Sequence, residues 1–166
     1  MIRFVTYLWY VIRHKWFVFV ACCRLGIPWL GVVHDLSKLS PCEFGPYSRQ
    51  FFNSDGSRRS VRDKTGAYDP NKQNQDFKAA WLFHQRNKHH WQAWISIGNR
   101  GNLVPLPMPR KYCVEMVADW CGAGMAISGE PNPCGWYKKN RDDLLLHPRS
   151  RDEIETILEQ EFGYVR

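Results

Sequence analysis

Several signatures that would assign this chain to a familiar class are missing from it. No two cysteines are spaced as C-x-x-C, which argues against a thiolate zinc site. No run alternates between apolar and polar residues with a period of two, so no sheet is predicted. No internal repeat or second domain is visible, which leaves one domain over residues 1–166. Nothing looks secretory, so we expect a cytoplasmic protein whose thiols stay reduced and act as small core residues.

An uninterrupted apolar segment of membrane-spanning length is also missing. Residues 16–33 are strongly apolar, but Arg24 interrupts the run and Gly26 and Pro28 break it. A membrane span needs roughly 20 consecutive apolar residues. A signal peptide needs a short apolar region that ends in a small-residue cleavage site. We therefore predict no membrane span here and expect buried helices instead.

The bulk composition is that of a folded, basic protein. Hydrophobic residues make up 44% of the 166 residues, which is enough for one sizeable core and argues against global disorder. The formal net charge of +7 attracts phosphate-bearing ligands, nucleic acid or anionic membranes. A basic protein with no polyanionic partner is equally compatible with this charge.

Start and stop signals for helices predict an all-α chain. Gly26 is a plausible helix stop, and Pro28 suits the first turn of a following helix. Capping boxes are predicted at Ser40–Glu43 and at Ser150–Glu153. The expected helices cover 2–13, 14–25, 28–38, 41–52, 76–97, a stretch opening at Pro109, 136–146 and a last one ending near Gly163. Together they predict a compact helical bundle.

Residues 53–75 differ sharply from their surroundings. They are polar and contain glycine, and four cations lie close together at Arg58, Arg59, Arg62 and Lys64. A loop of this length is usually functional or mobile. The segment is therefore either a flexible basic insertion or a basic lid over a phosphate-containing substrate.

The His34–Asp35 pair is the most informative feature of the sequence. It can offer one imidazole nitrogen and one carboxylate oxygen to a single metal ion. Further ligands must then come from distant segments. The candidates of suitable chemistry are His14, His84, His89, His90 and Asp119.

Asp119 strengthens this hypothesis because it interrupts an apolar helical stretch. A buried carboxylate is costly unless it is paired or bound to metal. A salt bridge to a buried arginine is the ordinary alternative, just as a lone buried histidine is usually a hydrogen-bonded core residue. Mixed imidazole and carboxylate ligands suit a divalent ion such as Mn, Fe, Co, Ni, Zn or Mg without selecting one.

The order His14, His34–Asp35, Asp119 resembles the ligand order of the HD superfamily of metal-dependent phosphohydrolases. The segment HDLSK is also similar to the HD-x-x-K form found in HD-GYP cyclic dinucleotide phosphodiesterases. In those enzymes additional histidines, including an adjacent pair, hold a second metal, and this resemblance implies that role for His84, His89 and His90. The chain lacks the GYP motif. Its segments HDLSK, EFGPY, HQRNKHHW and WYKKNRDDLLLHP resemble an uncharacterised family of phage and bacterial HD-like proteins.

This resemblance implies an HD-like bundle that uses one or two divalent metals to hydrolyse a nucleotide or another phosphate ester. Asp35 and Lys38 are the expected catalytic residues. The expected substrate-binding residues are Lys38, Arg58, Arg59, Arg62, Arg86 and Asn87. The alternative is a non-catalytic, metal-stabilised helical protein that binds nucleic acid or a protein partner.

Helix geometry constrains the histidines in the middle of the chain. On an unbroken helix, His84 and His90 are rotated apart by roughly 120°, so they do not converge on one ion. Either the helix ends or bends near Asn87 and Lys88, or only some of the three histidines bind metal; we favour the break. Glu43 is expected to complete a capping box, with a supporting role beside the metal as the alternative.

Overall fold

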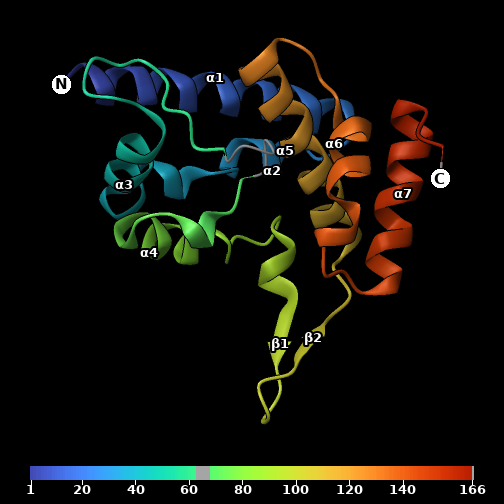
Figure 1. The fold of residues 1–166 in the computed structure, drawn as a ribbon. Helices are drawn as coiled ribbons and strands as arrows, with labels where there is room; N and C mark the ends of the chain where they lie inside the picture. The colour runs from blue at the N-terminus through green and yellow to red at the C-terminus, as the bar shows by residue number, and fades with distance from the viewer. Residues whose placement is uncertain (63–67, 166) are drawn as a thin grey trace. The chain divides into compact units, whose positions relative to one another are not determined.

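The computed structural model describes residues 1–62 and 68–165, and Figure 1 shows its ribbon. The fold is mostly helical, as predicted. It contains two compact units, and each is described by itself. The first unit comprises Met1–Arg13 and Asp35–Gln85, and the second comprises His14–His34 and Arg86–Arg166. Lys64, predicted to belong to the basic cluster, lies outside the described residues.

Helix α1 (Ile2–Arg24) is one unbroken helix, where the sequence analysis expected two. Residues 13 and 14 are Arg and His, which continue a helix readily, so nothing in the sequence stops it there. The helix ends where expected. Gly26 adopts a left-handed conformation with φ of +78°, and the Ile27 amide donates to the Cys22 carbonyl over 2.9 Å.

The first unit continues with η1 (Leu36–Leu39), α3 (Pro41–Phe51), η2 (Pro70–Lys72) and α4 (Gln75–His84). Its core is mainly aromatic. The buried residues are Tyr7, Val11, Tyr47, Phe52, Phe77 and Ala80. Helices α3 and α4 lie antiparallel, because the start of α3 meets the end of α4 and the end of α3 meets the start of α4.

The capping box predicted at Ser40–Glu43 is wrong. Ser40 does precede α3, but its hydroxyl donates to the Ser37 carbonyl over 2.6 Å instead of accepting from the helix. The Glu43 side chain is buried and reaches across to α4. A long-range hydrogen bond to a buried imidazole has replaced the local cap.

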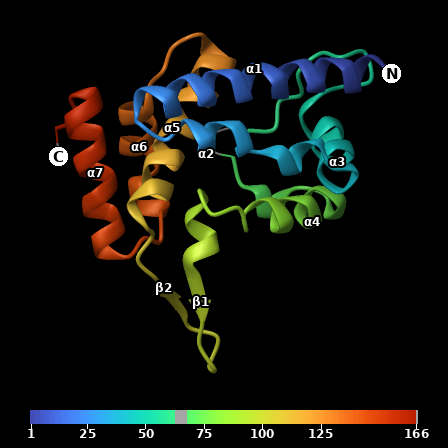
Figure 2. The same cartoon turned by 180° about the vertical axis from the view of Figure 1, so that it is seen from behind.

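The second unit contains α2 (Pro28–Val33), η3 (Trp91–Trp94), α5 (Arg110–Ser128), α6 (Pro133–Asn140), η4 (Arg141–Asp143) and α7 (Pro148–Phe162), as Figure 2 shows from behind. Helix α5 is the centre of this unit and is buried on nearly every side. Its main core brings Met116, Val117 and Trp120 against residues of α6 and α7, including Tyr137 and Ile154.

Two glycines allow helices of the second unit to approach α1 closely. A Cβ atom at Gly122 of α5 would lie 2.3 Å from Val18 Cγ2 and 2.8 Å from the Val18 backbone nitrogen. A Cβ atom at Gly31 of α2 would lie 2.9 Å from the Phe19 Cα atom. Real Cβ atoms do not make such contacts, so both packings require glycine.

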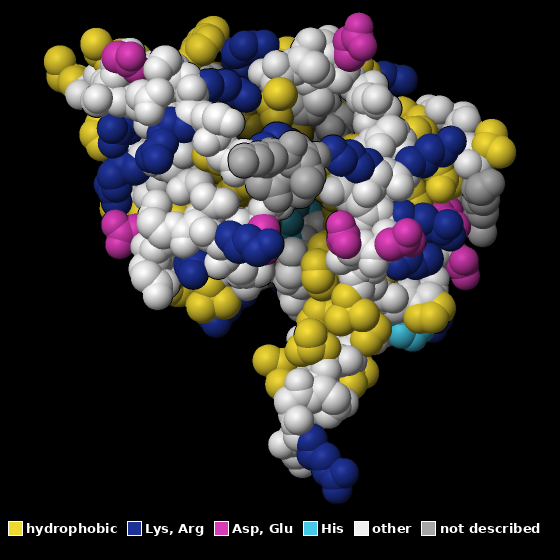
Figure 3. Space-filling model, viewed as in Figure 1, with side chains coloured by type: hydrophobic (Ala, Val, Ile, Leu, Met, Phe, Trp, Pro, Cys, Tyr) yellow, Lys and Arg dark blue, Asp and Glu magenta, His cyan; other side chains and the backbone are white. Residues whose placement is uncertain are grey.

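The helix expected over 76–97 is wrong in part, and the structure contains a two-stranded sheet that was not predicted. Helix α4 already ends at His84, and a hairpin follows from β1 (Ile95–Ile97) and β2 (Leu103–Pro105), paired antiparallel with Ser96 opposite Val104. Apolar side chains line this hairpin in Figure 3. Trp91 and Trp94 lie in η3 instead of in a longer α4, and they pack against the core of the second unit.

The last helix starts two residues before its predicted capping box, which is also wrong. His147 is the N-cap, and its Nδ1 atom accepts from the Arg149 amide over 3.1 Å. Ser150 lies inside α7, where its hydroxyl accepts from the Met108 amide over 2.7 Å. The predicted end is confirmed, because Gly163 closes α7 in a left-handed conformation.

The cysteines were expected to be small core residues. Cys22, Cys113 and Cys121 are buried, as predicted, but Cys23 and Cys42 are exposed and are not core residues. Cys23 lies near the end of α1 and Cys42 lies in the first turn of α3.

Within the described ranges, no helix has both the length and the apolar character needed to cross a membrane.

Candidate metal centre

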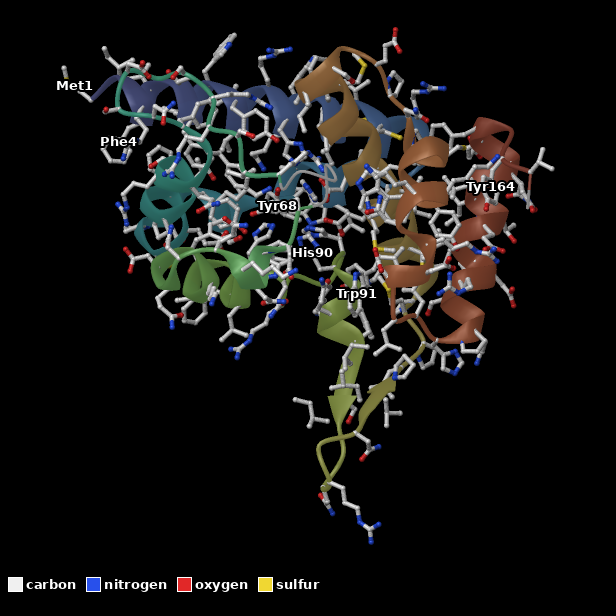
Figure 4. All side chains as sticks on the ribbon, in the orientation of Figure 1. Met1, Phe4, Tyr68, His90, Trp91 and Tyr164 are labelled. Carbon is white, nitrogen blue, oxygen red and sulfur yellow. The ribbon has the colours of Figure 1, made fainter. Side chains whose placement is uncertain are left out.

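The second unit gathers three of the predicted ligands, His14, His34 and His89, around two acidic residues of α5. His14 lies on α1, His34 follows α2, and His89 and His90 lie on the segment after α4, where Figure 4 labels His90. The acids are Glu115 and Asp119, four residues apart and therefore on the same face of α5. His14, His34 and His89 are each at most 3% exposed.

Asp119 lies between two imidazoles. Its Oδ1 atom is 3.2 Å from His14 Nε2 and 3.4 Å from His34 Nε2. Ligand atoms bound to one ion at about 2.0–2.2 Å lie about 3.0–3.4 Å from one another, by simple coordination geometry. Both distances from Asp119 therefore match the spacing of ligands around one ion, and the ligand atoms of the three side chains lie within 4.8 Å of one another.

Glu115 contacts the other ring nitrogen of His34, Nδ1. Its Oε1 atom is 3.1 Å from His34 Nδ1 and 3.3 Å from His89 Nδ1. An ionised carboxylate only accepts hydrogen bonds, so His34 Nδ1 carries the hydrogen and Nε2 faces Asp119. A carboxylate that orients a histidine in this way is a usual partner of metal-ligating imidazoles. The sequence analysis did not find Glu115, although its four-residue spacing from Asp119 was a usable signal.

The first unit repeats the same arrangement with different residues. Glu43 Oε2 is 2.9 Å from His84 Nδ1, and His84 Nε2 faces Asp35 Oδ1 at 3.5 Å. The order carboxylate, imidazole, carboxylate thus matches that of Glu115, His34 and Asp119. Glu43 therefore has the supporting position that the sequence analysis kept as its alternative to capping.

Asp35 adopts an unusual backbone conformation. Its φ is 54° and its ψ is 23°, and among the residues that the structure describes it is the only non-glycine residue with a positive φ. Aspartate tolerates this left-handed region better than most residues, but at some cost in free energy. The conformation ends α2 and begins η1, so that Lys38 lies one turn later and forms an ion pair with the Asp35 carboxylate.

Burial and neighbouring groups shift the pKa values of three of these side chains in opposing directions. Burial alone would raise the pKa of Asp119, but the neighbouring His14 and His34 outweigh burial and hold that pKa well below its ordinary value. Burial likewise opposes ionisation of Glu115, yet its hydrogen bonds with His34 and His89 lower its pKa. Burial lowers the pKa of His84, despite the nearby Asp35 carboxylate, and so favours the neutral imidazole.

Arg58 and Arg59, two of the predicted substrate-binding residues, contact different parts of the first unit. Arg58 covers aromatic rings, with its guanidinium carbon 5.3 Å from the Tyr10 ring centroid and 6.0 Å from that of Phe52. Arg59 donates to the Arg49 carbonyl over 2.8 Å and lines a hollow of about 400 Å³ at the start of α4. His84 is at the other end of α4, so the structure does not bring Arg59 to the first unit's histidine.

The remaining predicted residues are His90, Arg62, Arg86 and Asn87. Helix α4 ends at His84, and the Asn87 carbonyl accepts from the His90 amide over 2.9 Å, so the predicted break is confirmed. Arg86 and Arg62 are exposed, and Asn87 is half-buried. The rings of His89 and His90 are 4.3 Å apart between centroids, within the turn that this break creates.

Comparison with known proteins identifies a family whose function is unknown. No curated protein matches the chain, and no solved structure matches it. One family model matches residues 3–160, which is almost the whole chain, and its description is a family of unknown function, DUF5662. The chain therefore belongs to the family DUF5662.

Proposed function

We propose that this protein is a metal-dependent phosphohydrolase acting on a nucleotide or another phosphate ester, in a cytoplasmic setting. The observation that carries the proposal is the repeated arrangement of glutamate, histidine and aspartate. In the second unit these residues are Glu115, His34 and Asp119, with His14 completing the set.

The donor set fits a divalent ion of the Mn, Fe, Co, Ni, Zn or Mg group. It combines imidazole nitrogens with carboxylate oxygens, and it contains no thiolate. His14, His34 and Asp119 supply three donors, which leaves coordination positions for water and substrate. When bound in such a site, a divalent ion lowers the pKa of a bound water molecule and polarises a phosphoryl oxygen.

The protein groups have distinct roles in this proposal. Glu115 fixes the tautomer of His34, which directs Nε2 toward Asp119. Glu43 does the same for His84 in the first unit. Lys38 supplies a cation beside Asp35, and an ammonium group there suits a phosphate oxygen.

Elemental analysis of the purified protein tests the metal, and a phosphate-release screen over a nucleotide panel with added Mn, Co, Ni or Mg tests the reaction. Asp119→Asn should lose metal and hydrolysis while keeping its helical content. Asp142→Asn makes the same change at an exposed position of η4 and serves as the control. Metal retained at full stoichiometry in Asp119→Asn would exclude the assignment.

The alternative from the sequence analysis, a non-catalytic metal-stabilised protein, predicts a different pair of results. Metal would be present and would raise the melting temperature, since a ligand of the native state stabilises it. No nucleotide or simple phosphate ester would be hydrolysed under any of the four metals. Under either reading, Glu115→Gln should weaken metal binding by about 10–100-fold without abolishing it, because an orienting carboxylate is lost, whereas Glu130→Gln, at an exposed position, should not.

A further inference from the structure

The exposed side of α1 is apolar along its whole length. Eight large apolar residues of this helix each have at least 39% of their surface exposed, and seven of them lie on one side of it. These seven are Ile2, Val5, Leu8, Trp9, Ile12, Trp16 and Val20. With 3.6 residues per turn, they fall within roughly 120° of the helix circumference. We call these seven residues the α1 stripe.

The opposite side of the helix is the one that packs into the protein. Tyr7, Val11, His14, Val18 and Cys22 are buried, and their spacing of three or four residues places them together. The α1 stripe is therefore additional to the core-facing side. A contiguous exposed apolar surface of this kind usually marks an interaction site. Trp9 and Trp16 are its largest members, at 61% and 60% exposed.

The charged residues of α1 that flank the stripe are all basic. Arg13 and Arg24 lie along one edge, within roughly 40° of the stripe on the helix circumference. Lys15 lies along the other edge and donates to the carbonyls of Val32 and His34. Residues 1–34 contain no Asp or Glu at all, and the first acidic residue is Asp35.

We infer that the α1 stripe docks on the surface of an anionic lipid bilayer. Tryptophan and aliphatic side chains along one side of a helix, with arginine at the edge, are the features of a helix that lies in the membrane interface. Anionic headgroups complement Arg13 and Arg24. A second copy of the chain fits less well, because two such stripes would face each other with cations at their edges and no acidic residue of 1–34 to pair with them.

Sedimentation of the full-length protein with lipid vesicles tests this inference. The protein should bind vesicles that contain phosphatidylglycerol and should not bind vesicles of phosphatidylcholine alone. Binding should fall at 1 M salt, where the Debye length is only about 3 Å. The double variant Trp9→Ser/Trp16→Ser should bind at least tenfold more weakly.

A second variant and a control keep the test independent of folding. Arg13→Gln/Arg24→Gln should weaken binding by about 25-fold, at about fivefold for each cation near the surface. Leu82→Ser/Ile127→Ser removes two exposed apolar residues from α4 and α5, and it should bind like the unaltered protein.

Two results would overturn the inference. One is equal binding, or no binding, to both kinds of vesicle. The other is a dimer in light scattering that the Trp9→Ser/Trp16→Ser variant converts to monomers, since the stripe would then be an interface between two copies. Neither result depends on the metal or on hydrolysis.

Discussion

Gly122→Ala should loosen the packing of α5 on α1 and, through it, the metal centre. The new Cβ atom would lie 2.8 Å from the Val18 backbone nitrogen and 3.1 Å from its Cα atom. Side-chain rotation cannot relieve contacts with backbone, so the helices must separate by about 0.5–1 Å to reach ordinary contact distances of about 3.5 Å. Asp119 is three residues before Gly122 and His14 is four residues before Val18, so the same movement separates two proposed ligands.

The size of the effect follows from two opposing terms. Overpacking costs up to about 3 kcal/mol, and alanine gains about 1 kcal/mol over glycine inside a helix. The net loss of about 2 kcal/mol corresponds to a melting temperature about 4–8 °C lower for a chain of this size. Metal affinity should fall by about 10–100-fold, as it does when a partner of a ligating residue is lost.

Thermal unfolding and titration calorimetry with the bound metal measure these two effects. Gly45→Ala is the matched control, because its Cβ atom in α3 would meet only the flexible end of Arg49, at 3.1 Å. That variant should be unchanged or slightly more stable. If Gly122→Ala were as stable as Gly45→Ala, the close packing of α5 on α1 described above would be incorrect.

Three further outcomes are expected. Stability should fall above about pH 9, because burial raises the pKa of Cys22 and Cys121 from 9.0 to about 12. The folded state then keeps protons that the unfolded state loses as pH rises. Denaturant titrations at pH 7.5 and 10 measure this difference, and equal midpoints would contradict it. Arg58→Ala should lower the melting temperature by about 1–4 °C through loss of its two aromatic contacts, and a rise in KM without that loss would show that the arginine serves the substrate instead. The sequence-based hypothesis of a binuclear centre predicts two metal ions per chain and about one in His89→Ala/His90→Ala, whereas one ion in both proteins would show a mononuclear site.

The sequence alone determined features that depend on local chemistry. Gly26 and Gly163 end their helices because each adopts a left-handed conformation that other residues rarely adopt. If His84 and His90 bind one ion, helix geometry requires a break between them; the break was predicted near Asn87 and Lys88, and α4 ends at His84.

Only the tertiary structure decided which partners these residues have. Glu115 bonds a histidine 81 positions away, and Glu43 bonds one 41 positions away. No local pattern encodes such a pairing, and for Glu43 and Ser40 a local capping pattern predicted the wrong partner. The residue types of a candidate metal centre are thus visible in the sequence, but the carboxylates that orient its histidines depend on how helices distant in the chain pack together.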